Sequence, residues 1–142
     1  MEVQKGTAQQ LILLVDDCRD TRDMYVELLE EDFRIVVAST GAEAVRCASE
    51  LRPSLVVMDL ALPDMSGEEA ILRIRQDQGT DRVPIVVVSG YPEPRQSARV
   101  WDAYLLKPCH ADVLSSCIRK VLDRSVAEAT GPPHSARLVS SQ

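Results

Sequence analysis

The sequence has few aromatic residues and no excess of positive charge. Aromatic residues make up 4% of the 142 residues, and 16 Lys and Arg stand against 22 Asp and Glu, for a net charge of −6. A nucleic-acid-binding surface needs clustered cations or stacking rings, and an anionic membrane surface also attracts cations. We therefore expect no nucleic-acid partner and no membrane partner.

Long hydrophobic runs and paired cysteines are missing as well. No stretch approaches the roughly 18 apolar residues of a membrane span. The N-terminal segment leads into only five apolar residues, Leu11–Val15, which are too few for a signal peptide. The four cysteines form no CxxC pair, and neither histidine completes a zinc-type spacing. These absences predict a soluble, cytoplasmic protein with reduced thiols.

Short apolar runs without polar alternation are present, and such runs are typical of parallel strands buried on both faces. Helical spacing of apolar residues occupies the segments between them. This alternation, repeated about five times, predicts an α/β fold with helices on both faces of a parallel sheet. The expected strands are Leu11–Val15, Ile35–Ala38, Leu55–Met58, Ile85–Val88 and Tyr104–Leu106, and the expected helices are Arg19–Glu31, Thr40–Leu51, Ser66–Arg75 and His110–Arg124.

The length fits a single domain, since domains cluster at about 100–150 residues. We predict an N-terminal extension at 1–9 and a folded domain at 10–124. Residues 125–142 contain Gly131-Pro132-Pro133 and read as a polar, disordered tail.

Polar residues follow four of the predicted strands. Asp16 and Asp17 follow the first run, Asp59 the third, Ser89 the fourth and Lys107 the fifth. Ligands bind at the carboxyl ends of the strands of an open parallel sheet. Each residue alone is better explained as a helix N-cap. Together, three carboxylates, a hydroxyl and an ammonium predict a site.

Three carboxylates held close together repel one another and need a cation. Oxygen ligands with room for water suit Mg²⁺, which binds one or two carboxylates plus a phosphate. A carboxylate can also attack phosphorus and form an aspartyl phosphate. Asp59 is the natural nucleophile because it stands alone, and the adjacent Asp16-Asp17 pair is suited to hold the metal. The Lys107 ammonium and the Ser89 hydroxyl would bind phosphoryl oxygens.

Four segments, taken together and in this order, resemble the receiver domain of two-component response regulators. They are LILLVDD at Leu11–Asp17, VMDLALPDMSG at Val57–Gly67, VVVSGY at Val86–Tyr91 and YLLKP at Tyr104–Pro108. The resemblance covers about residues 10–124. It implies a flavodoxin-like, doubly wound sheet of five parallel strands in the order 2-1-3-4-5.

The resemblance also implies site roles. Asp59 would accept phosphate from a histidine kinase or a phosphotransfer protein in a reaction that requires Mg²⁺. Asp16, Asp17 and Asp59 would hold the ion together with the main-chain carbonyl of Ala61.

Further family features fall on the last two strands. Ser89 and Lys107 would contact the phosphate, and Ser89 and Tyr104 match the hydroxyl-and-aromatic switch pair. The family has a cis peptide before the residue that matches Pro108. A trans proline at the first helical position is the alternative.

The sequence departs from the family between Ser89 and Lys107, which is about one helical turn shorter than usual. Pro92 and Pro94 also delay any helix in this stretch, so the fourth helix should be short, irregular or absent. Trp101 stands where the family has a small residue. It is either an exposed partner anchor or a plug over the shortened segment, and we favour the plug.

The leading hypothesis is a stand-alone receiver whose phosphorylation changes binding to a downstream protein. It is a phosphoacceptor rather than an enzyme, apart from catalysing its own phosphotransfer and dephosphorylation, and a phosphorelay intermediate is a variant of it. The alternative is a vestigial receiver that acts as an interaction scaffold. A haloacid-dehalogenase-like phosphatase needs a second acid two residues after the nucleophile, where this chain has Ala61.

Overall fold

The apolar runs form strands and the periodic segments form helices. The computed structural model describes residues 9–95 and 100–129. In chain order the elements are β1 (Leu11–Val15), α2 (Arg19–Leu29), β2 (Arg34–Ala38), α3 (Gly41–Leu51), β3 (Leu55–Met58), α4 (Gly67–Gln76), β4 (Ile85–Ser89), β5 (Ala103–Leu106) and α5 (Ala111–Ala129).

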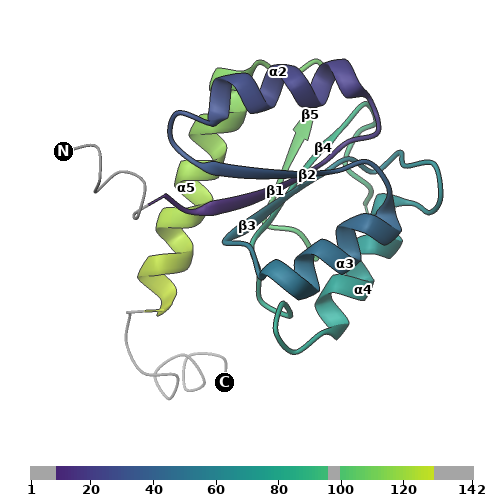
Figure 1. Ribbon diagram of the computed structural model, residues 1–142, viewed down its shortest axis with the longest axis vertical. Helices are drawn as coiled ribbons and strands as arrows, with labels where there is room; N and C mark the ends of the chain where they lie inside the picture. Colours follow the sequence, from purple (N-terminus) through teal and green to yellow (C-terminus); the bar gives the residue numbers. More distant parts are fainter. Residues whose placement is uncertain (1–8, 96–99, 130–142) are drawn as a thin grey trace.

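The five strands form one parallel sheet in the order β2-β1-β3-β4-β5. Helices α2 and α5 cover one face of the sheet, and α3 and α4 cover the other (Figure 1). The predicted doubly wound fold is therefore confirmed. The first crossover leads from β1 to β2 on one side of it, and the next leads from β2 past β1 to β3 on the other side. Strand order therefore reverses between β1 and β3. This is the place where open α/β sheets bind ligands.

Alternate residues of the central strands supply two separate cores. In β1, Ile12 and Leu14 pack with α2 and α5, whereas Leu13 and Val15 pack with α3 and α4. All four side chains are buried, and full burial of such a side chain contributes about 1.5–3 kcal/mol. Two apolar cores thus fix the strand ends on which the polar residues lie.

The helix starts follow the local sequence signals. The Thr40 side chain accepts a hydrogen bond from the Glu43 N–H at 3.1 Å, and Ser66 accepts one from the Glu69 N–H at 3.1 Å. Each bond satisfies an amide that has no partner inside its own helix. Helices α3 and α4 therefore begin directly after these capping residues.

Helix α5 extends past its predicted end at Arg124 and runs to Ala129. The sequence between these residues contains no helix breaker, and the first Gly-Pro pair comes only at Gly131-Pro132. The first part of the predicted tail is therefore helical, and residues 130–142 lie outside the described part. None of the described helices is long and apolar enough to cross a bilayer.

The connection between β4 and β5 differs from the other crossovers. Its described residues, 90–95 and 100–102, contain no helix, as the short spacing predicts. Trp101 is 9% exposed and packs in the core beneath α3 and α4, and its indole N–H donates to Glu93 at 2.8 Å. Arg75 of α4 donates to the Val100 carbonyl at 2.8 Å. Trp101 is therefore a plug and not an exposed anchor.

Candidate functional site

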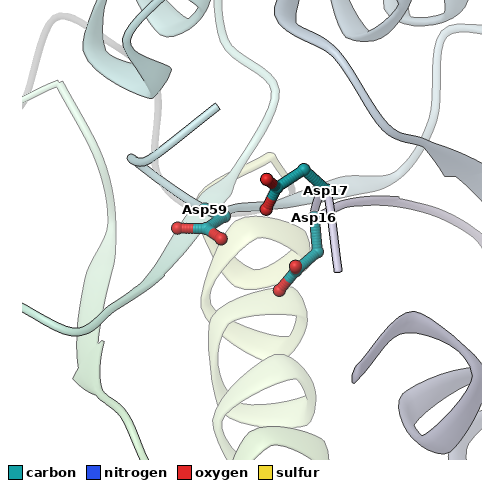
Figure 2. Close-up of side chains that lie close together, drawn as sticks. All are labelled: Asp16, Asp17 and Asp59. Carbon is teal, nitrogen blue, oxygen red and sulfur yellow. The ribbon is translucent and has the colours of Figure 1, made fainter. Parts of the chain in front are cut away.

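Three aspartates meet at the carboxyl edge of the sheet. Asp16 and Asp17 follow β1, and Asp59 follows the adjacent strand β3, with which β1 pairs up to Val15 and Met58. Each aspartate offers a carboxylate oxygen within 4.8 Å of the others. Figure 2 shows the three side chains converging from the two strand ends. The sheet topology thus brings together the carboxylates that the sequence predicted as a cluster.

Lys107, which follows β5, bridges two of these carboxylates. Its Nζ lies 3.2 Å from Asp16 Oδ2 and 3.1 Å from Asp59 Oδ2. Burial acts to lower the pKa of Lys107, but the hydrogen bond and charge of Asp59 and the charge of Asp16 outweigh burial and raise that pKa. Lys107 therefore stays an ammonium at neutral pH and partly neutralises the cluster.

Asp59 is buried, with 5% of the residue exposed. Burial raises the pKa of its carboxyl above the ordinary value, although the Ala61 N–H and Lys107 oppose the rise. The Ala61 N–H donates to Asp59 Oδ1 at 3.0 Å, while Oδ2 faces Lys107. The two oxygens of this carboxylate are thus held in different environments.

The segment after β3 folds back on itself and packs against the backbone of Asp59. The Gly67 N–H donates to the Leu60 carbonyl at 2.8 Å, and Ala61 and Ser66 form an antiparallel bridge. A Cβ at Gly67 would lie 2.3 Å from the Asp59 carbonyl oxygen. Only glycine permits this close approach of α4 to the backbone of Asp59.

Asp64 fastens the same segment to the start of α3. Its Oδ1 accepts the Gly41 N–H at 2.7 Å and its Oδ2 accepts the Ala42 N–H at 2.9 Å. These two amides lower the pKa of the Asp64 carboxyl, with Ala42 contributing most. Together with the Thr40 cap, Asp64 satisfies the first three amides of α3. Its negative charge also interacts favourably with the positive end of the helix dipole.

Ser89 and Tyr104 are joined through one residue, Tyr91. The Ser89 Oγ accepts the Tyr91 N–H at 3.1 Å, and the Tyr104 hydroxyl donates to the Tyr91 carbonyl at 2.7 Å. Ser89 is buried at the end of β4, and its carbonyl accepts the Lys107 N–H at 2.7 Å. Ser89 therefore lies at the same edge of the sheet as Lys107.

The peptide bond between Lys107 and Pro108 is cis, as the family resemblance implies. A groove of about 610 Å³ lies beside this turn, between it and α2. Met24 and Leu28 of α2 line the groove and are about half exposed. Lys107 lines the same groove and also contacts Asp16 and Asp59, so the groove adjoins the acidic cluster.

The donor set fits a hard divalent cation. Carboxylate oxygens are the ligands that Mg²⁺ and Ca²⁺ prefer, and Mg²⁺ keeps several waters when few protein ligands are present. Asp17 is exposed whereas Asp16 and Asp59 are buried, so water has access to one side of the cluster. This arrangement can hold a cation next to a buried carboxylate and an ammonium.

Two contributors to the site, Arg22 and Asp64, have no role predicted from the sequence. Arg22 of α2 donates from Nη1 to the Asp16 main-chain carbonyl at 2.8 Å, and Asp64 caps α3. Arg22 is six residues from Asp16 and reaches it from the first turn of α2. Asp64 is 23 residues from Gly41, so its contact joins segments that lie apart in the sequence.

A doubly wound sheet with an acidic cluster and a lysine at its carboxyl edge defines a receiver-like α/β protein. The model of the response regulator receiver domain matches residues 12–119. The chain belongs to the response regulator receiver domain family.

Relatives and solved structures agree with this assignment. The chain is 32% identical over 124 residues to the transcriptional regulatory protein KdpE of Mycobacterium tuberculosis, covering 84% of this chain and 54% of KdpE. It is 39% identical over 106 residues to an uncharacterized 14.6 kDa protein of Leptolyngbya boryana, covering 71% and 81%.

Among solved structures, the receiver domain of a sensor histidine kinase from Pseudomonas aeruginosa is 26% identical, with a TM-score of 0.74. The match covers 82% of this chain and 99% of that domain, which has a magnesium ion coordinated in its active site cleft. The chain spans 54% of the length of KdpE and 13% of a second sensor kinase that it matches.

Proposed function

We propose that this chain accepts a phosphoryl group on Asp59, in a Mg²⁺-dependent reaction, from a histidine kinase or a phosphotransfer protein. The observation that carries the proposal is the position of Lys107, whose ammonium lies 3.1 Å from Asp59 and 3.2 Å from Asp16. A cation at this place can neutralise charge that develops on a transferred phosphoryl group. We assign the receiver domain to residues 10–124, with α5 continuing to Ala129.

In the proposed step, one carboxylate oxygen of Asp59 attacks the phosphorus of an N-phosphorylated histidine. The P–N bond breaks, and its electron pair leaves with the imidazole. The other ring nitrogen already carries the proton, so neutral imidazole departs. Lys107 and the Ser89 hydroxyl would hold phosphoryl oxygens; Ser89 Oγ accepts the Tyr91 N–H, and its own proton would be donated to the phosphoryl group.

The proposed ligands of Mg²⁺ are the carboxylates of Asp16, Asp17 and Asp59 and the main-chain carbonyl of Ala61. When bound, the ion supplies charge neutralisation for the phosphoryl oxygens. Two findings support this assignment. The three carboxylates approach within 4.8 Å of one another, and a related receiver domain has magnesium in its cleft.

The apolar groove beside Lys107 supports a helical phosphodonor. Met24 and Leu28 of α2 line this groove, and their exposed apolar side chains would suit the apolar stripe of a partner helix. A histidine on that helix would then lie close to the acidic cluster.

After transfer, we propose that the Ser89 and Tyr104 contacts rearrange and change binding to a downstream protein, whether that partner is another chain or another domain.

Intact mass spectrometry tests the proposal. The wild type is incubated with a small acyl phosphate and Mg²⁺, beside Asp59→Asn and the remote control Asp77→Asn. We expect one phosphoryl group on the wild type and on Asp77→Asn, and none on Asp59→Asn. An unmodified wild type that nevertheless binds Mg²⁺ would contradict the proposal and favour the scaffold alternative.

A further inference from the structure

Arg22 contacts the acidic cluster from the first turn of α2. Its Nη1 donates to the Asp16 main-chain carbonyl at 2.8 Å. Its main-chain N–H bonds the Cys18 carbonyl at 3.0 Å, so the backbone of Arg22 is fixed in the helix. The guanidinium therefore reaches back across the junction between β1 and α2.

Every polar atom of Asp16 has a partner. Its N–H donates to the Ala38 carbonyl at 3.1 Å, and its carbonyl accepts from Arg22. Its Oδ1 accepts the Cys18 N–H at 2.8 Å, and its Oδ2 faces Lys107 at 3.2 Å. Since Cys18 makes no side-chain cap for α2, Asp16 and Arg22 together tie the start of the helix to the end of the strand.

We propose that Arg22 is a positioning residue of the metal site. By holding the main chain of Asp16, it keeps that carboxylate beside Asp17 and Asp59. The inference rests on the proposed function, because it requires that the cluster bind Mg²⁺. Arg22 cannot itself be a ligand, since a guanidinium has only donors. Outer-shell partners of metal ligands typically change metal affinity by about 10–100-fold.

The sign of the effect separates positioning from charge. Removing a positive charge near the cluster would, by electrostatics alone, strengthen its attraction for a divalent cation. Arg22→Met removes the donor and the charge and keeps an unbranched, apolar side chain. We expect its Mg²⁺ dissociation constant to rise about tenfold, which is opposite to the effect of charge.

Arg19 offers a matched control on the same helix. It pairs with Asp23 at 3.9 Å, and 84% of its side chain is exposed. Arg19→Met therefore removes the same charge from the first residue of α2 without removing a contact to Asp16. We expect Mg²⁺ binding that is unchanged or slightly tighter. Arg22→Lys keeps the charge but has a single donor nitrogen on a shorter side chain, so it should bind with intermediate affinity.

Isothermal titration calorimetry with Mg²⁺ alone, on the full unphosphorylated chain, measures these affinities, and urea unfolding shows that each variant is folded. Equal affinities for Arg22→Met and Arg19→Met would overturn this inference and leave the proposed function intact. A wild type that fails to bind Mg²⁺ would overturn both. If Arg22→Met does not fold, the comparison of Arg22→Lys with Arg19→Lys decides: weaker binding only in Arg22→Lys supports positioning, and equal binding refutes it.

Discussion

Gly67 is the position where adding a single methyl group should disturb the position of Asp59 most. A Cβ added there would lie 2.3 Å from the Asp59 carbonyl oxygen and 2.6 Å from the Leu60 Cα. Both are backbone atoms and cannot turn aside as a flexible side chain does. Even a tight contact of 3.0 Å requires the first distance to grow by about 0.7 Å, in an interior with almost no free volume. Gly67→Ala must therefore displace Asp59 or the start of α4.

Two opposing terms set the size of the effect. Overpacking in a well-packed region costs typically about 1–3 kcal/mol. Alanine in place of glycine in a helix returns up to about 1 kcal/mol. We expect Gly67→Ala to lower the free energy of unfolding by about 1–2 kcal/mol, which is a drop of about 1 M in the urea midpoint for a small protein.

Gly90→Ala is the matched control, because a Cβ at Gly90 meets no atom within 4 Å and Gly90 has no positive φ. This variant should leave stability unchanged or raise it by up to about 1 kcal/mol, since alanine restricts the unfolded chain. Urea unfolding followed by circular dichroism measures both variants. Phosphorylation by an acyl phosphate should also slow in Gly67→Ala. Equal urea midpoints for the two variants would refute the packing argument.

Two further predictions concern the segments that hold the site. Asp64→Asn should lower the melting temperature at pH 7. The folded-state pKa of Asp64 is lowered, so its carboxylate stabilises the fold above the unfolded pKa of about 3.9. That stabilisation is lost as the pH falls through the folded pKa. The melting difference from wild type should therefore vanish toward pH 2, and a difference independent of pH would contradict the assignment. Trp101→Ala should cost about 3–5 kcal/mol in urea unfolding because the ring is buried, whereas an exposed anchor would cost less than about 0.5 kcal/mol.

The sequence predicted those parts of the molecule that depend on local pattern. Unbroken apolar runs such as Leu55–Met58 gave the strands, and the polar residue after each run marked the edge of the sheet. Asp16 and Asp59 could be placed together because all strands of a parallel sheet end at the same edge. The Thr40 and Ser66 caps were predictable because each bond spans only three residues.

The remaining features depend on contacts between distant segments. Arg75 binds the Val100 carbonyl 25 positions away, and Asp64 caps a helix that begins 23 positions earlier. No periodicity encodes such a pair, since the residues next to each partner in the sequence do not mark its contact. The sequence pattern predicts the end of α5 too early, at Arg124, because Ser125 begins a polar stretch, although no helix breaker follows until Gly131.

Tyr91 gives the edge of the sheet a cooperative character. Its amide is bonded to the Ser89 hydroxyl and its carbonyl to the Tyr104 hydroxyl, so both hydroxyls depend on the position of one residue. A displacement of Tyr91 disturbs the two bonds in a single event. The ends of β4 and β5 are thereby coupled through a single loop residue.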